Sequence, residues 1–217
     1  YDRDNVRKKA AEYRFLLHRG EEFGFPVELH AREEIDGMAV GSSHGGVIAL
    51  CSERILPPLS SSALSTRGFY VLLDGIEDPY NFGYALRSLY AAGVDGVLLG
   101  QRNWMSAAGV VCRASAGASE LLPLYLSEET SCLSLFRARG YRLVCADRED
   151  AVSLFDADLS LPLFLVIGGE KRGISRTLLE AADLRVKIDY GRDFGASLSA
   201  ASAAAVAGFE VLRQNRK

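Results

Sequence analysis

The chain has 217 residues, 48% of them hydrophobic and 24% charged, which is typical of a soluble globular protein with room for a sizeable core. Its formal net charge is −3, which argues against a protein that holds nucleic acid through overall positive charge, although local basic patches act independently of that sum. No stretch reaches the length and hydrophobicity of a membrane span and no signal peptide is visible, so we expect no membrane segment.

Four cysteines are scattered without the short Cys–Cys or Cys–His spacings of a metal site: Cys51, Cys112, Cys132 and Cys145. They do not form a recognisable disulfide framework either. We therefore expect reduced thiols, no bound metal and a cytoplasmic protein.

The first 51 residues are expected to form a small α/β domain. Apolar residues at helical spacing predict a helix over residues 5–23, and short apolar segments follow at 26–29 and 46–51. Basic side chains of this helix either contact phosphates or lie in solvent: Arg7, Lys8, Lys9, Arg14 and Arg19. Residues 52–66 shift to proline and serine without a regular pattern and are predicted to be a linker.

Residues 67–217 alternate apolar strand-like runs with helical patterns. Strands are predicted at 69–73, 96–99, 121–125, 142–146, 163–167 and 184–188, and helices at 81–92, 105–112, 129–139, 176–181 and 197–213. Such strands indicate an α/β domain whose mostly parallel sheet has helices on both faces. Ligands of these sheets bind at the carboxyl ends of the strands.

A turn after the first of these strands leads into a helix that carries Asn81 and Arg87. Asp78 before Pro79 suits a helix N-cap followed by proline in the first turn. Gly83 and Arg87 are four residues apart and share a helix face, so the glycine would leave room for a phosphate or ribose beside the guanidinium. The alternative is structural: Asn81 shapes a turn and Arg87 is a solvated surface residue.

A glycine-rich turn, GGEKRGIS, follows the strand at 163–167 and matches neither the phosphate-loop nor the dinucleotide-binding pattern. Gly168 and Gly169 permit close approach of backbone to a ligand, and Glu170 lies between glycines there. The alternative is an ordinary strand-to-helix turn with solvated charges. The helix at 197–213 consists mostly of Ala, Ser and Gly at its start, so a neighbouring backbone, a second subunit or a flat ligand must pack closely against it.

Together and in this order, these segments resemble the SpoU-class RNA 2′-O-ribose methyltransferases of the SPOUT superfamily. The first motif of that family, Asn-x-Gly-x-x-x-Arg, matches Asn81, Gly83 and Arg87. The second motif matches Leu165, Val166, Gly168, Glu170, Gly173 and Ser175, and the third matches Ile188, Ser197 and Leu198. Residues 113–123 are similar to a further family segment, and the resemblance covers residues 68–213.

The resemblance implies a domain with a C-terminal trefoil knot, a shortened RNA substrate-binding domain before it, and a homodimer with its cofactor site near the subunit interface. It implies S-adenosylmethionine as cofactor and rRNA or tRNA as substrate. The positions implied for the cofactor are Gly168, Gly169, Glu170, Ile188, Leu198 and Ala203. The positions implied for catalysis are Arg87, Asn81, Glu170, Ser197 and Ser199, with Arg87 contacting the ribose or phosphate.

The chain departs from the family at Ser199, where the family has Asn, and at Ala201, where it has Ser. Ser199 keeps a donor and an acceptor but with a shorter reach. The sequence favours an RNA 2′-O-methyltransferase. It leaves open a catalytically silent RNA-binding dimer of the same fold and a base methyltransferase of the same superfamily, whereas a nicotinamide oxidoreductase lacks its dinucleotide-binding pattern here.

Overall fold

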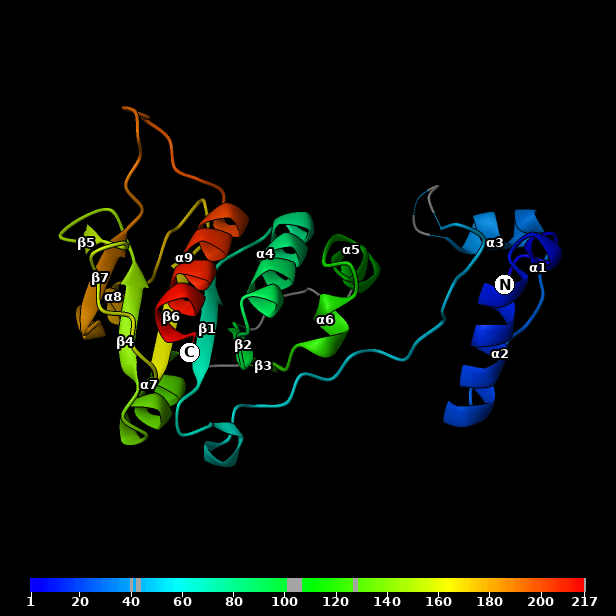
Figure 1. Cartoon of the computed structure of the whole chain (residues 1–217), viewed down its shortest axis with the longest axis horizontal. Coiled ribbons are helices and arrows are strands. Elements are labelled where there is room, and N and C mark those ends of the chain that lie inside the picture. Colours follow the sequence, from blue (N-terminus) through cyan, green and yellow to red (C-terminus); the bar gives the residue numbers. More distant parts are fainter. Residues whose placement is uncertain (40, 42–43, 101–106, 127–128, 217) are drawn as a thin grey trace. The chain divides into compact units, whose positions relative to one another are not determined.

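The computed structural model describes residues 1–39, 41, 44–100, 107–126 and 129–216 (Figure 1). The chain divides into two compact units, Tyr1–Glu53 and Arg54–Lys217. Most of the segment predicted to be a linker belongs to the second unit. Leu56, Leu59 and Leu64 of this segment pack against the hydrophobic core there.

The N-terminal unit is helical over much of its described length. α1 (Asn5–Lys8) and α2 (Ala10–Phe23) replace the single predicted helix because Lys9, with φ −124° and ψ 47°, leaves the helical region. α3 (Arg32–Met38) has no counterpart among the predicted elements. This unit was predicted to combine helices with strands. Segments 26–29 and 46–51 form no strand, so that part of the prediction is wrong. The β-type pairing that the structure describes here is one parallel bridge between Asp2 and His30.

The described residues of the second unit form a seven-stranded sheet in the order β3-β2-β1-β6-β4-β7-β5, in which every strand pair is parallel. The strands are β1 (Phe69–Asp74), β2 (Gly96–Leu99), β3 (Leu124–Leu126), β4 (Arg142–Ala146), β5 (Val152–Ser153), β6 (Leu163–Gly168) and β7 (Leu184–Lys187). β6 lies between β1 and β4, with Asp74 opposite Gly168 at the end of the β1–β6 pair. The carboxyl ends of all strands therefore lie along one edge of the sheet.

Helices cover both faces of this sheet, as predicted. The helical elements of the unit are η1 (Ser61–Ala63), α4 (Pro79–Ala91), α5 (Ala108–Ala114), α6 (Ala118–Leu121), α7 (Glu129–Ala138), α8 (Arg176–Ala181) and α9 (Ala200–Asn215). α4 and α9 lie side by side on the face that presents Val71 and Leu165 (Figure 1). α7 and α8 pack with Leu72 and Val166 on the other face. Residues adjacent along a strand thus enter opposite cores, which is why the strands are apolar throughout.

The predicted boundaries differ most from the structure at three elements. Leu121 ends helix α6, so the third strand begins only at Leu124. The helix predicted at 105–112 is found as α5, and its first two residues lie outside the described part of the chain. The last helix begins at Ala200 because Ser199 is its N-cap. The trefoil knot stays a prediction.

The close approach expected for the last helix is supplied by a helix of the same unit. A Cβ placed on Gly208 of α9 would lie 3.2 Å from the Cβ of Ala92 and 3.3 Å from a methyl carbon of Leu89. The small residues on this side of α9 therefore let it settle against α4, and their burial supports this: Ala200, Ala201, Ala204, Ala207 and Gly208.

The last turn of α9 holds the loop that precedes β6. The Gln214 side chain accepts a hydrogen bond from the Leu159 amide at 2.9 Å and donates one to the Ala157 carbonyl at 3.0 Å. The Asn215 side chain accepts from the Leu161 amide at 3.2 Å and donates to the Leu159 carbonyl at 3.0 Å. Two amide side chains thus satisfy backbone groups of the loop as a neighbouring strand would.

Candidate active site

The glycine-rich loop of the second motif is fastened to the end of β1. The Gly169 amide donates a hydrogen bond of 2.6 Å to the backbone carbonyl of Asp74, and the Ser175 amide donates one of 3.0 Å to the Asp74 carboxylate. Asp74 therefore holds both ends of the loop. Sequence reasoning missed this residue, although an acidic side chain at the end of a buried strand was a usable signal.

The glycines of this loop are required by contact of backbone with backbone. A Cβ on Gly168 would lie 2.5 Å from the carbonyl carbon of Gly173, and a Cβ on Gly169 would lie 2.2 Å from the carbonyl oxygen of Gly75. Gly169 and Gly173 also form an antiparallel bridge across the loop. The loop therefore offers a ligand a compact surface of main-chain groups beside the end of β6.

A side-chain hydrogen bond joins the first motif to the second. Asp78 caps α4 by accepting from the amides of Tyr80 and Asn81 at 3.3 Å and 3.0 Å, which confirms the predicted cap. The Asn81 side chain then donates a hydrogen bond of 2.8 Å to Oε1 of Glu170. Two predicted catalytic residues that are 89 positions apart in the sequence are thus brought into direct contact.

Arg87 lies on the exposed side of α4, and its side chain makes no hydrogen bond or ion pair with any residue that the structure describes. It is therefore available to an anionic ligand. The interpretation of Gly83 was wrong: a Cβ there would lie 2.6 Å from the Cβ of Ala114 and 2.9 Å from the Val111 carbonyl oxygen. Gly83 is buried because α5 packs on α4 at this point, not because a ligand needs the space.

The third motif lies between β7 and α9. Ser197 is exposed, whereas Ile188, Leu198 and Ala203 are half-buried. Ser199 caps α9, with its hydroxyl accepting a hydrogen bond of 3.2 Å from the Ser202 amide. Among the described residues, no hydrogen bond or ion pair links these five positions to Asn81 or Glu170.

Tyr190 is a second residue that sequence reasoning missed. Its hydroxyl accepts a hydrogen bond of 3.0 Å from the Leu198 amide, inside the third motif. A lone tyrosine in a polar loop gives no pattern from which this contact could have been predicted.

Neither a metal site nor a reactive Cys145 thiol is found among the residues that the structure describes. No group of three or more His, Cys, Asp and Glu side chains within the described ranges could hold a metal ion. Burial raises the pKa of Cys145 in β4 to about 12, so this thiol stays protonated at neutral pH and is a poor nucleophile. Within the same residues, every helix is too short or too polar to cross a membrane.

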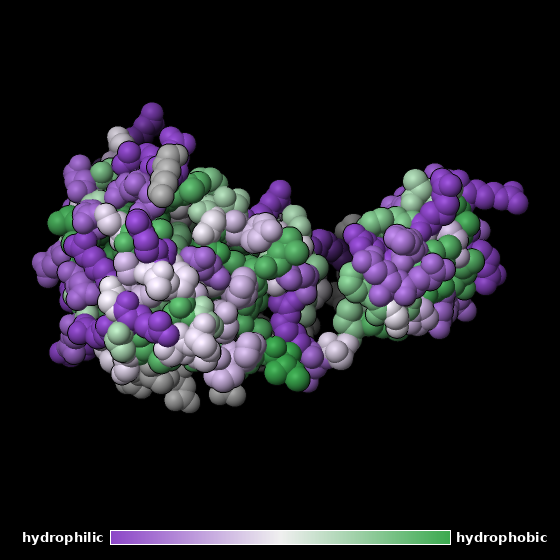
Figure 2. Space-filling model, turned by 60° about the horizontal axis from the view of Figure 1, so that its bottom comes forward, coloured by the Kyte–Doolittle hydropathy of each residue, from purple (hydrophilic) through white to green (hydrophobic). Residues whose placement is uncertain are grey.

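The basic side chains predicted to contact phosphates lie on α1 and α2 and at the junction between them. Only some of these side chains are available to bind a phosphate, because others pair with acidic neighbours. Lys9 pairs with Glu12 at 3.7 Å, and Arg19 pairs with Glu22. The Arg19 guanidinium also lies 5.3 Å and 5.6 Å from two exposed phenylalanine rings of α2, Phe15 and Phe23. Apolar and hydrophilic residues are interspersed over the face of this unit that Figure 2 shows. Arg7 and Lys8 remain exposed.

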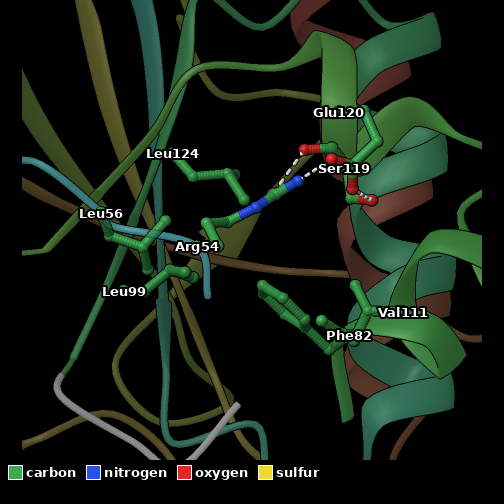
Figure 3. A pocket seen from close by; sticks show the side chains of 9 residues that line it. Arg54, Leu56, Phe82, Leu99, Val111, Ser119, Glu120 and Leu124 are labelled. Carbon is green, nitrogen blue, oxygen red and sulfur yellow. Dashed lines mark hydrogen bonds and ion pairs between the residues drawn. The ribbon is translucent and has the colours of Figure 1, made fainter. Parts of the chain in front are cut away.

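A small cavity lies beside β2 and α6, apart from the residues predicted for function (Figure 3). Arg54 reaches across it to donate a hydrogen bond of 2.8 Å to the Ser119 carbonyl and to pair with the Glu120 carboxylate. Its apolar wall consists of Leu56, Phe82, Leu99, Val111 and Leu124. With a volume of about 30 Å³ it has room for about one water molecule, so it is too small for a cofactor.

Comparisons with known proteins identify relatives over most of the chain. The 23S rRNA (guanosine-2′-O-)-methyltransferase RlmB of Xanthomonas campestris pv. campestris is 31% identical over 227 residues, which cover 98% of this chain and 90% of the relative. The RlmB of Shewanella oneidensis is 29% identical over 206 residues, covering 93% of this chain and 83% of the relative.

A solved structure shares the fold. The AdoMet-bound rRNA methyltransferase from Sinorhizobium meliloti matches with a TM-score of 0.67 and 25% identity, over 76% of this chain and 63% of that one. This chain therefore spans less than two thirds of that protein. The model of the SpoU rRNA Methylase family matches residues 68–209, which contain all three motifs. The chain belongs to the SpoU rRNA methylase family.

Proposed function

We propose that the protein transfers a methyl group from S-adenosylmethionine to a ribose 2′-hydroxyl of rRNA or tRNA, as a cytoplasmic homodimer. The observation that carries this proposal is the hydrogen bond between Asn81 and Glu170, which unites the first two motifs at the carboxyl edge of a parallel sheet. The names of the relatives, which are rRNA 2′-O-methyltransferases, support the same chemistry.

The residues at this edge suit S-adenosylmethionine. The loop from Gly168 through Gly169 to Glu170 supplies main-chain groups beside the end of β6, and Ile188, Leu198 and Ala203 supply half-buried apolar surface. β6 and β7 are separated by β4, so the ends of these strands lie about 10 Å apart, a span that an adenosine group with an amino-acid tail can bridge. When bound, the cofactor supplies a methyl carbon that is already electrophilic because it is attached to a sulfonium.

Arg87 is assigned to the RNA. Its guanidinium has N–H donors and no acceptor, so it donates hydrogen bonds to a phosphate or ribose oxygen. Holding the 2′-hydroxyl in line with the methyl carbon, within about 3–3.5 Å, is the main task of the site. Asn81 and Glu170 fix the positions of α4 and the loop, while Ser197 and Ser199 lie next to the proposed cofactor position Leu198.

The outer surface of α4 and α9 supports the proposed dimer. Four aromatic side chains are exposed on these neighbouring helices: Tyr80 at 54%, Tyr84 at 48%, Tyr90 at 45% and Phe209 at 48%. Exposed aromatic residues beside a helix of small residues favour contact with another protein surface. A dimer through this surface would place α4, and with it Arg87, near the partner.

The test is Arg87→Ala, with Arg176→Ala as a matched control because the Arg176 side chain is 90% exposed on α8. We expect Arg87→Ala to abolish transfer of labelled methyl to bulk rRNA and tRNA while its calorimetric affinity for S-adenosylmethionine stays that of the wild type. The control keeps both properties. Turnover by Arg87→Ala would contradict the assignment of this residue, and label on the base after digestion to nucleosides would identify a base methyltransferase.

Ser199 favours one second candidate, a silent RNA-binding dimer. Its hydroxyl is engaged in capping α9, so the position that is Asn in the family serves a structural purpose here. Cofactor binding without transfer to any RNA pool, including total RNA from cells that lack the protein, would identify this alternative.

A further inference from the structure

The segment between β7 and α9 contains two of the positions proposed to contact the cofactor, Ile188 and Leu198. It forms the orange-to-red loop that extends beyond the ends of the strands in Figure 1. Residues 191–197 are all exposed, so the loop has little packing of its own to fix its shape. A loop of this kind loses conformational entropy when a ligand orders it, unless it is ordered beforehand.

Tyr190 closes this loop on itself. Its hydroxyl accepts the 3.0 Å hydrogen bond from the Leu198 amide, and its ring meets that of Phe194 edge-on, with centroids 6.0 Å apart and planes at 61°. Tyr190 is half-buried whereas Phe194 is 52% exposed, so the tyrosine is the anchored member of the pair. Because Tyr190 follows Ile188 by two residues, its bond to Leu198 brings the two ends of the loop together.

We propose that Tyr190 is a positioning residue that orders the third-motif loop for S-adenosylmethionine, an inference that rests on the proposed function. The phenol acts through Leu198 and holds that residue beside Ile188 before the cofactor arrives. Since the Leu198 amide is already bonded to Tyr190, the backbone carbonyl and side chain of Leu198 are the groups left for the cofactor. Positioning of this kind strengthens binding and leaves the chemical step unchanged.

The test compares Tyr190→Phe, which removes only the hydroxyl, with Tyr141→Phe as a matched control. Tyr141 immediately precedes β4, so it lies at the end of the strands opposite to the third-motif loop. Its hydroxyl donates a 2.7 Å hydrogen bond to the Ser65 carbonyl. For Tyr190→Phe we expect the calorimetric Kd for S-adenosylmethionine to rise about fivefold, as for the loss of one typical hydrogen bond. The KM for the cofactor should rise with it while kcat at saturating cofactor stays unchanged.

Two further readings separate positioning from general loss of structure. Amide hydrogen exchange of residues 191–198 should accelerate in Tyr190→Phe and not in Tyr141→Phe, which we expect to lower stability without changing Kd. If the wild type binds the cofactor and Tyr190→Phe binds it equally well, the positioning role is overturned and the proposed function stands. If the wild type does not bind the cofactor, both proposals are overturned.

Discussion

The hydrogen bond between Asn81 and Glu170 can be tested quantitatively by a double-mutant cycle. The perturbations are Asn81→Ala, Glu170→Ala and the pair together, assayed by single-turnover methyl transfer and by urea unfolding. Each single change removes the 2.8 Å bond, so the double mutant should lose little more than the worse single mutant.

The expected magnitude follows from the geometry. The acceptor is a carboxylate, which strengthens the bond, but Glu170 is exposed and Asn81 only half-buried, so water competes for both groups. These opposing effects suggest a coupling free energy of about 1 kcal/mol, or about a fivefold coupling in the rate of transfer. A structural role alone would produce coupling in the unfolding free energy but not in the rate.

The control cycle uses Arg176 and Glu180, an ion pair of 2.6 Å within α8. Both side chains are largely exposed, so this pair should show little coupling in stability and none in the rate. Rates that are simply additive for Asn81 and Glu170 would refute the view that the first two motifs act as one unit.

Two further predictions concern stability. Gly83→Ala places a Cβ 2.6 Å from that of Ala114, and this overpacking should lower the free energy of unfolding by about 1–3 kcal/mol in a urea titration; an unchanged midpoint would contradict the contact between α4 and α5. The hydrogen bonds from Arg213 lower the pKa of Glu210 below its usual 4.5, against the opposing effect of burial. The resulting stabilisation is present above pH 4.5 and is lost as the pH falls through the lower folded pKa, so Glu210→Gln should flatten the acid limb of a plot of stability against pH. An acid limb identical to that of the wild type would contradict this assignment.

The sheet was largely predictable because both of its faces are covered. Continuous apolar runs such as 163–167 identify buried parallel strands without any alternation. β5 escaped prediction because two residues, Val152 and Ser153, carry no periodicity, and their strand exists only through pairing with β7. The strand order, with β6 inserted between β1 and β4, is a tertiary property that no local pattern encodes.

The candidate site was predictable only as far as the family motifs reach. Asn81 and Glu170 were named from their motifs, and the structure brings them into contact. Asp74 and Tyr190 were missed because their roles depend on which amides happen to lie opposite them in space. Gly83 was misread for a related reason: a glycine in a sequence shows that space is needed, but not whether a ligand or another helix fills it.

The central place of β6 has a consequence for the synthesis of this protein on the ribosome. Both neighbours of β6 precede it in the chain, so β1 and β4 have no shared partner until residue 168 has been made. The four hydrogen bonds that join the Gln214 and Asn215 side chains to the loop before β6 form only after residue 215 has been made. These contacts of the second unit are therefore completed long after β1 and β4 have been made. A nascent chain that stalls before residue 214 would expose an unfinished sheet to chaperones and proteases.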